Sequence, residues 1–274
     1  MIVEKEIKSV LSHGNGSERV YLMDLHPNDF PQIIEYLSRI AKKHNYGKIF
    51  AKVPAKYGPT FINAGYVNEA SIPGFYSNKE DALFLMKYNN KERSQPEIEA
   101  MVAFQEMLLQ KANTKLAALG KGYGMRPLKE SDTPAMVPVF KEVFETYPFP
   151  VYDPNFLIKS MREDDTRYFG AFYKGELIGI SSAECNTQKQ NAEMTDFAVI
   201  PSHRGKKLAN HLLLLMETTL AAEGFKTLYT IARLHSLPMN KTFYNHKYRY
   251  SGTLIRNTQI SGKIESMNVW YKKI

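Results

Sequence analysis

The sequence predicts an α/β protein made of two successive units of similar element order, joined by a helical linker. In each half, short segments of alternating apolar residues neighbour longer segments whose apolar residues recur at helical spacing. Between the halves, a polar stretch leads into a helical pattern that Gly120, Gly122 and Gly124 bring to an end. The predicted division is residues 1–90, a linker helix within 91–122, and residues 123–274.

The first unit has the order strand, helix, strand, short helix and two extended segments. The helix closes on Gly47 and the short helix on Gly65, because glycine favours the backbone turn that ends a helix. In order, these elements span 18–25, 26–47, 48–53, 59–66, 71–76 and 82–88.

The linker helix is predicted to begin near Pro96. Proline fits the first turn of a helix, and Glu97 and Glu99 place negative charge at the positive end of its dipole. Helical spacing then continues to residue 118, and the second unit begins near Tyr123.

The second unit ends with the same succession of element types as the first, which predicts a weak internal repeat. The elements are a strand at 191–200, a long helix ending at Gly224, a strand at 227–234, a short helix at 239–247, and strands at 250–256 and 265–273.

Composition narrows the function classes. The chain has 274 residues, of which 43% are hydrophobic and 23% charged, as in an ordinary soluble globular protein. Its net charge of +8 is uneven, at +2 for residues 1–120 and +6 for 121–274. A basic half suits a polyanionic partner such as nucleic acid, an anionic lipid surface or a phosphorylated cofactor, and equally a solvated surface without a partner.

Two of those classes are disfavoured. The basic residues form no run and are not interleaved with aromatics, so we expect no nucleic-acid partner. No apolar run approaches the length of a membrane span, and the charged N-terminus does not resemble a targeting segment. Cys185 is the only cysteine and has no disulfide partner in the chain, so we expect a cytoplasmic protein.

The stretch IPSHRGKKLANHLLLLME at 200–217 carries the clearest chemical signal. A strand ends, a turn with Gly205 follows, and a long helix begins with N–H groups that have no partner within the helix. Arg204, Lys206 and Lys207 are unfavourable at this end of a helix dipole unless an anion is bound. The equivalent helix of the first unit starts with HPNDFP, whose prolines and Asp29 do not suit an anion. The first unit is therefore interpreted as structural or as an oligomerisation domain.

The strand DFAVIP followed by HRGKKLANHLL resembles the acetyl-CoA-binding motif of the GNAT acetyltransferase superfamily. Arg204 and Ala209 match the ends of that motif, and Lys207 stands where glycine is usual. The resemblance implies a splayed, mostly antiparallel mixed sheet in the second unit, preceded by a smaller degenerate GNAT-like copy. It also implies acetyl-CoA as co-substrate. Independently of the resemblance, the seven histidines show no metal-ligand spacing such as HExxH, so no metal is expected. The residues that the resemblance assigns to the co-substrate are Ala198, Val199, Ile200, Arg204, Gly205, Lys206, Lys207, Leu208, Ala209 and Asn240.

Longer strings sharpen the resemblance. YPFPVYDP (147–154), NAEMTDFAVIP (191–201), YTIARLHSLPMN (229–240) and ISGKIESMNVWYK (260–272) are similar to the β-lysine N6-acetyltransferases, the partners of lysine 2,3-aminomutase. The resemblance implies direct acetyl transfer from acetyl-CoA to the N6 amine of β-lysine, giving the compatible solute N6-acetyl-β-lysine. Another small amine, such as lysine or a diamine, is the main rival substrate.

A general base is needed because only the neutral amine attacks a thioester. Glu193 lies six residues before Val199, the offset at which related enzymes of the superfamily place their base. Strand alternation predicts Glu193 on one face and Asp196 on the other. Asp196 and Glu184 are the alternative bases.

The general acid depends on the register of the helix MNKTFYNHKYRY. If Tyr248 follows the family's usual glycine, Lys247 stands at that glycine and Phe243 falls on the acid position. A shift of one residue makes Tyr244 the acid, and packing onto the sheet explains either aromatic residue equally well.

An acceptor with two amines and a carboxylate needs acidic and basic partners. The predicted substrate-binding residues are Tyr152, Asp153, Glu184, Asp196, Arg233, Glu265 and Asn268. A CoA-binding regulator without catalysis is an alternative function, and a homodimer is left open.

Overall fold

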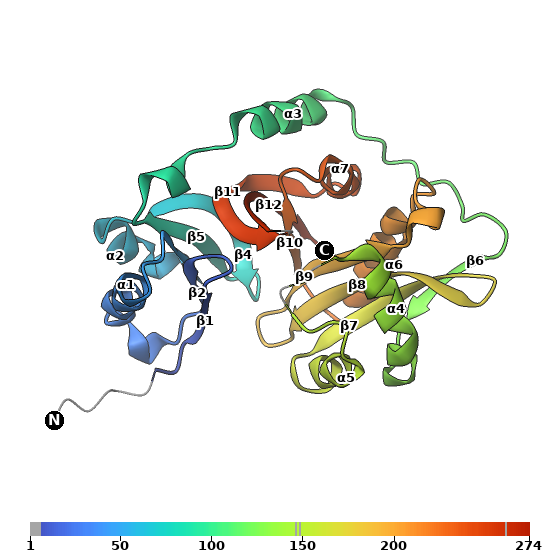
Figure 1. Ribbon diagram of the computed structural model, residues 1–274, viewed down its shortest axis with the longest axis horizontal. Helices are drawn as coiled ribbons and strands as arrows, with labels where there is room; N and C mark the ends of the chain where they lie inside the picture. The colour runs from blue at the N-terminus through green and yellow to red at the C-terminus, as the bar shows by residue number, and fades with distance from the viewer. Residues whose placement is uncertain (1–6, 146, 148, 261) are drawn as a thin grey trace.

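The computed structural model describes residues 7–145, 147, 149–260 and 262–274, and its two mixed sheets lie side by side (Figure 1). The first sheet has five strands in the order β1-β2-β3-β5-β4. Only the β2–β3 pair is parallel. Its strands are β1 (Val10–Gly14), β2 (Arg19–Asp24), β3 (Lys48–Pro54), β4 (Val67–Tyr76) and β5 (Glu80–Tyr88).

The second sheet has seven strands in the order β11-β12-β10-β9-β8-β7-β6. Its only parallel pair is β9–β10, so the predicted mostly antiparallel mixed sheet is confirmed. Its strands are β6 (Tyr123–Pro127), β7 (Thr166–Tyr173), β8 (Glu176–Asn186), β9 (Asn191–Val199), β10 (Thr227–Arg233), β11 (Arg249–Ile260) and β12 (Lys263–Lys273).

Helices cover the outer faces of both sheets. The α-helices are α1 (Ile33–Lys43), α2 (Gly58–Asn63), α3 (Ile98–Leu109), α4 (Thr133–Val143), α5 (Pro154–Glu163), α6 (Leu208–Ala222) and α7 (Leu237–Asn245). Single turns of 3-10 helix occur at Pro27–Asp29, Ala55–Tyr57, Lys91–Ser94, Glu130–Asp132 and Pro201–His203. No described helix is both long enough and apolar enough to cross a membrane.

The predicted internal repeat is confirmed by strand order. The first sheet runs β1-β2-β3-β5-β4, and five strands of the second run β8-β9-β10-β12-β11 in the same relative order. Each parallel pair is joined by a helix, α1 between β2 and β3 and α6 between β9 and β10. In register, Tyr21 of β2 pairs with Phe50 of β3 where Glu193 of β9 pairs with Tyr229 of β10.

The helix expected over 26–47 is shorter than predicted. It splits into the 3-10 turn Pro27–Asp29 and α1, because Pro27 and Pro31 lack N–H groups and Phe30 is extended. Asp29 is buried, where its carboxylate accepts the backbone N–H groups of Lys8 and Ser9.

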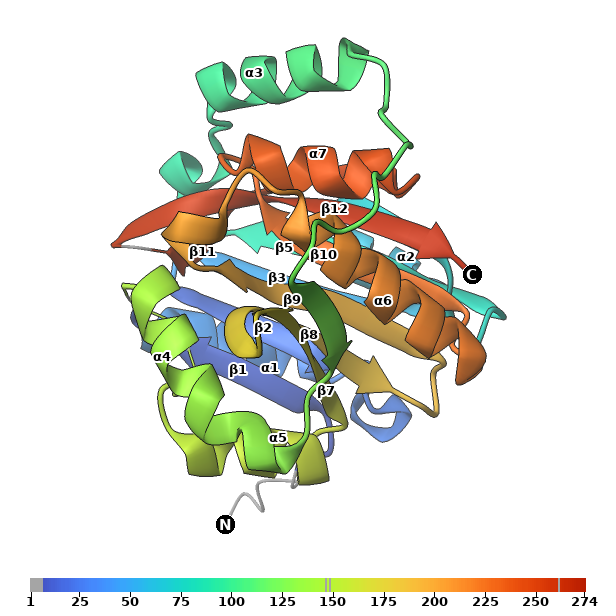
Figure 2. The same ribbon diagram turned by 90° about the vertical axis from the view of Figure 1, so that its right-hand side faces the viewer.

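The linker helix also ends early. α3 stops at Leu109 rather than near residue 118, and an extended segment continues to β6. Side chains of α7 take part in this ending: Lys241 and Tyr244 donate to the carbonyls of Met107 and Leu108. Figure 2 shows α3 lying above α7, with the extended segment descending past α6.

Packing divides the second sheet into regions. On one face, β7 to β10 pack against α3, α6 and α7. On the other face, α4 and α5 cover β7 and β8, whereas β10, β11 and β12 pack against the first sheet. The interface between the sheets is apolar, with Phe50 and Phe84 from the first sheet meeting Tyr229, Leu254 and Val269 from the second.

The sheets also meet where β4 runs beside β11. The Ser251 hydroxyl accepts the N–H of Ser71 at 2.8 Å and donates to the Ser71 carbonyl at 2.5 Å. Gly252 packs on the backbone of Glu69, where a Cβ atom would overlap the Glu69 carbonyl oxygen. The two halves therefore form a continuous packed structure.

Candidate active site

The parallel strands β9 and β10 separate after a short paired segment. Pairing runs from Asn191–Thr227 to Glu193–Tyr229 and then stops, although β9 continues to Val199 and β10 to Arg233. The predicted splay is therefore present. In the first unit, β2 and β3 stay paired to Leu22, two residues before β2 ends, so the equivalent opening is missing there.

A β-bulge changes which side chains of β9 share a face. Thr195 pairs with Ser182 and Ala198 with Ile180, so Asp196 and Phe197 together oppose one residue of β8. Asp196 has a left-handed backbone, with φ of 54°.

From the bulge onward, the alternation of side chains between the two faces of β9 is shifted by one residue. The prediction that Asp196 and Glu193 lie on different faces of the strand is therefore wrong. The Ser182 hydroxyl, on the Thr195 face, donates to Asp196 at 2.6 Å. Phe197 instead packs on the α6 and α7 side, with its ring 5.8 Å from that of Phe243.

Three carboxylates consequently gather on one face of β8 and β9, and we call Glu184, Glu193 and Asp196 the carboxylate cluster. Glu184 and Glu193 are directly opposite each other across the two strands. Asp196 also accepts a short hydrogen bond from the Tyr147 hydroxyl, which comes from the YPFPVYDP string. Sequence reasoning did not single out Tyr147 or Ser182.

Burial and mutual repulsion perturb the cluster. Glu184 is accessible to solvent, yet the surrounding protein and the charges of Glu193 and Asp196 raise its pKa to about 8. Burial also raises the pKa of Glu193, and the charge of Lys52 and the nearby Tyr229 side chain act against that rise. The three carboxyl groups therefore do not all ionise together at neutral pH. The described residues offer no group of three or more His, Cys, Asp and Glu arranged to hold a metal ion.

The first unit contributes a cation beside the cluster. Lys52 projects from β3, and its ammonium donates to the Tyr229 hydroxyl at 3.3 Å. Tyr229 is also the register partner of Glu193 across β9 and β10. Lys52 has no local signature in the sequence, because only the packing of the two sheets brings it here.

The backbone at the end of β9 supports one of the predicted co-substrate contacts. The N–H of Ile200 donates to Ile178 of β8 and is occupied. Antiparallel pairing alternates, so the N–H of Val199 points away from β8, toward the opening beside β10. Ala198 is buried in the ladder opposite Ile180.

The anion turn has the predicted form. Arg204 donates from Nε to the Val199 carbonyl at 3.1 Å, which ties the turn to the end of β9. No acceptor among the described residues binds the backbone N–H groups of residues 205–209, which include Gly205, Lys206, Leu208 and Ala209. These donors at a helix N-terminus fit a pyrophosphate, and Gly205, Lys206 and Lys207 are exposed to solvent.

Both lysines that replace family glycines adopt the left-handed conformation. Lys207 has φ of 57° at the start of α6, and Lys247 has φ of 64° after α7. Glycine takes this conformation without strain, which accounts for its usual place at these positions. Lys247 at the glycine position supports the register that puts Phe243, not Tyr244, at the acid position.

α7 does not place Tyr244 at the opening. Its hydroxyl donates to Leu108 of α3 at 3.3 Å, on the opposite side from the carboxylate cluster. Phe243 is the residue beside β9 and has no proton to give.

The side-chain amide of Asn240 is already hydrogen-bonded within the protein and is not available to a ligand. Its amide nitrogen donates to the carbonyls of Arg233 and Ser236, and its oxygen accepts from Asn268 and Trp270, all at 2.9–3.0 Å. The Asn268 oxygen accepts from Thr253 at 2.7 Å. Asn240 and Asn268 are buried, so this network fixes α7 to β12.

We expect Asn240→Ala to lower the free energy of unfolding by about 2 kcal/mol, because buried donors of Asn268 and Trp270 lose their acceptor. Urea unfolding followed by circular dichroism measures this change. Asn245→Ala, which loses one bond to the N–H of Asn113 at the end of α7, should cost less than about 1 kcal/mol. Equal costs for the two variants would contradict the network's role.

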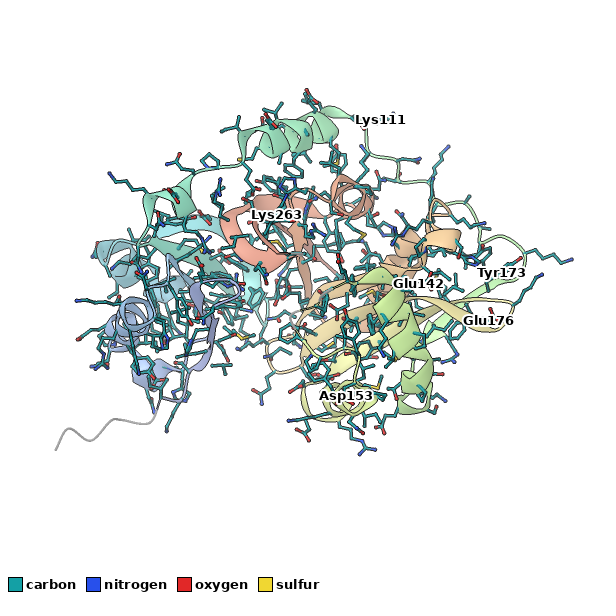
Figure 3. The ribbon with its side chains drawn as sticks, in the orientation of Figure 1. Lys111, Glu142, Asp153, Tyr173, Glu176 and Lys263 are labelled. Carbon is teal, nitrogen blue, oxygen red and sulfur yellow. The ribbon has the colours of Figure 1, made fainter. Side chains whose placement is uncertain are left out.

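The remaining predicted substrate residues also have structural partners. Asp153 caps α5 by accepting the N–H of Asn155 at 2.9 Å, and Figure 3 labels it at the base of that helix. Tyr152 donates to Phe144 at 2.7 Å. Arg233 and Glu265 form a two-pronged pair at 2.7 and 2.8 Å. The structure therefore brings Glu184, Glu193 and Asp196 together and leaves these others outside the cluster.

One cavity among the described residues lies away from this site. A volume of about 570 Å³ lies between β7, α5 and α6, lined by residues that include Leu128, Met161, Thr166 and Thr219. Its lining includes no member of the carboxylate cluster. The chemistry of the side chains, rather than cavity size, identifies the candidate site.

Comparison with known proteins agrees with this geometry. Residues 129–245 match the acetyltransferase (GNAT) family. A β-lysine N6-acetyltransferase of Methanococcus maripaludis is 32% identical over 96% of this chain and 96% of its own length. An N-acetyltransferase of Bacillus subtilis, YodP, is 28% identical over 98% of this chain and 97% of its own.

A β-lysine N6-acetyltransferase of Methanosarcina mazei is 26% identical over 89% of this chain and 98% of its own. The family match spans the strand, turn and helix that form the anion site, and the relatives extend through both halves. The chain therefore belongs to the GNAT family of acetyltransferases and is an acetyl-CoA-dependent N-acetyltransferase.

Proposed function

We propose that the protein transfers the acetyl group of acetyl-CoA to the N6 amine of β-lysine, by direct attack within a ternary complex. The observation that carries the proposal is the carboxylate cluster beside the splay of β9 and β10. Three carboxyl groups on one face suit an acceptor with two ammonium groups. The substrate named for two of the relatives is β-lysine.

Glu193 is the proposed general base. Its raised pKa brings the proton affinity of the carboxylate closer to that of an amine, and Tyr229 lies beside it as its register partner on β10. The neutral N6 amine then attacks the thioester carbon, the N–H of Val199 polarises the carbonyl oxygen, and CoA leaves as a thiolate. Attack leaves one surplus proton on the nitrogen, and this proton passes to the departing thiolate to give the thiol of CoA, since Tyr244 is turned toward α3.

The turn from Arg204 to Ala209 is proposed to hold the pyrophosphate of acetyl-CoA. When bound there, acetyl-CoA supplies the activated acyl group. Asp196 and Glu184 are proposed to hold the second ammonium of the acceptor, and Tyr147 and Ser182 fix Asp196 for this contact. A cytoplasmic location, with the half-buried Cys185 as a free thiol, is part of the proposal, as is the synthesis of a compatible solute.

The test is acetyl-CoA-dependent thiol release with β-lysine, α-lysine and 1,5-diaminopentane as acceptors. We expect β-lysine to have the highest kcat/KM, and mass spectrometry to find the acetyl group on N6. A higher kcat/KM for either of the other amines would change the proposed substrate. Tight acetyl-CoA binding without release for any acceptor would favour a CoA-binding regulator instead.

A further inference from the structure

Lys52 is a half-buried cation without a charged partner. Its ammonium donates to the Tyr229 hydroxyl and lies 5.5 Å from the ring centroids of Phe75 and Tyr229. Among the residues that the structure describes, no carboxylate oxygen lies within 4.0 Å of its nitrogen. An ammonium has three N–H donors, so the Tyr229 hydroxyl leaves two of them for a ligand.

The neighbouring cations of the first sheet are already paired. Lys48, fully buried on β3, contacts Glu69 at 3.5 Å and donates to the carbonyl of Ile255 at 2.5 Å. Arg19 donates to the Asn257 carbonyl and the Thr258 hydroxyl at 2.7 and 3.0 Å. These contacts bind the two halves together, whereas Lys52 has only a neutral hydroxyl.

Lys52 faces the carboxylate cluster from the opposite sheet. Burial lowers the pKa of Lys52, and the negative charges of Glu193 and Glu184 act against that lowering. Lys52 and Glu193 are half-buried and Glu184 is exposed, so an ammonium of the first sheet and carboxylates of the second are both accessible. In the view of Figure 2, β3 of the first sheet lies behind β9 and β10 of the second.

We propose that Lys52 binds the carboxylate of the acceptor, so that the site selects diamino acids over diamines and polyamines. This inference rests on the proposed function and names the residue that determines its substrate class. The charges are complementary, because an acceptor with two ammonium groups and one carboxylate matches two acidic contacts and one basic contact. Lys52 is a specificity residue supplied by the half that has lost its own anion turn and splayed strands.

The experiment compares β-lysine with β-lysinamide, in which a neutral amide replaces the carboxylate. For the wild type, we expect kcat/KM to favour β-lysine about 10- to 100-fold, the range of one charge-assisted hydrogen bond. Lys52→Met should reduce that preference to about threefold or less, mainly through KM for β-lysine, since only that bond is lost. Lys52→Arg should keep a clear preference.

Lys56→Met is the matched control, because Lys56 lies just after β3, is exposed, and pairs with Glu80 at 3.4 Å. The Lys56→Met variant should prefer β-lysine over β-lysinamide by the same factor in kcat/KM as the wild type. A wild type that does not distinguish the two acceptors overturns the inference without any variant. Equal losses for both acceptors in Lys52→Met also overturn it, since Lys52 would then act through Tyr229 on Glu193. Failure of all amines as acceptors would instead count against the proposed function.

Discussion

Replacing Glu193 with glutamine should lower kcat about 10²- to 10⁴-fold at neutral pH, the usual contribution of a positioned general base. Glutamine keeps the size of the side chain, but it cannot take the proton from the acceptor amine. The binding of acetyl-CoA should not change. Stopped-flow or steady-state thiol release measures the effect.

The pH dependence separates base catalysis from a loss of structure. In the wild type, kcat/KM should rise with pH as Glu193 ionises, in a range above that of an ordinary glutamate because burial raises its pKa. In Glu193→Gln, the rise of kcat/KM that follows the ionisation of Glu193 is absent. Activity recovers only at higher pH, where the acceptor amine, with a pKa of about 10.4, loses its proton to solvent. No recovery at high pH would argue against the base.

Two further variants test the assignment. Glu176→Gln changes an exposed glutamate near the start of the same strand that carries Glu184, labelled in Figure 3, and should retain full activity. Glu184→Gln should raise KM while retaining a measurable kcat. If Glu184→Gln abolishes turnover and Glu193→Gln does not, Glu184 is the base.

Gly252→Ala should lower the free energy of unfolding by about 3 kcal/mol or more, at the upper end of overpacking effects. The added methyl group would overlap the Glu69 carbonyl, which belongs to the backbone of β4 and cannot rotate away. The sheets must then separate locally, which disturbs the Ser71–Ser251 hydrogen bonds. Urea unfolding of the full chain measures the loss.

Gly124→Ala is the control for this prediction. Gly124 also lies in a strand, β6, but a Cβ atom there would meet nothing within 4 Å. The free energy of unfolding of Gly124→Ala should differ from that of the wild type by no more than about 0.5 kcal/mol. If Gly252→Ala proves as mild as this control, the contact between β4 and β11 does not hold the halves together.

Local pattern in the sequence predicted the elements around the site. Alternation marked β9 and β10, and the sequence from Arg204 to Ala209 marked the anion turn. Sequence order alone indicated the repeat that the strand topology confirms.

What the sequence could not supply depends on backbone detail and long-range packing. The bulge needs a residue with a left-handed backbone, and Asp196 takes this role instead of the glycine that would have indicated it. Strict alternation therefore placed Asp196 on the wrong face of β9. Asn240 fits a family pattern, and only the positions of Asn268 and Trp270 show that its side chain is already occupied.

Lys52 illustrates the same limit at the level of the whole fold. Lys52 lies in a strand without a distinctive motif, 141 residues before Glu193 in the sequence. No local sequence pattern relates two residues that are so far apart in the chain. The interpretation of the first half as a structural or oligomerisation domain therefore omitted the surface that it turns toward β9 and β10.

The apolar interface between the two sheets makes the repeat thermodynamically a single unit. Tyr229, Leu254 and Val269 are buried and pack against the first sheet, and we expect an isolated second half to expose them beside the unpaired edge of β11. Two halves that resemble separate folding units are thus expected to unfold in one cooperative transition, with a denaturant dependence set by the entire chain. Such an interface gives the first copy a role that does not depend on cofactor chemistry, because it covers apolar surface of the second copy.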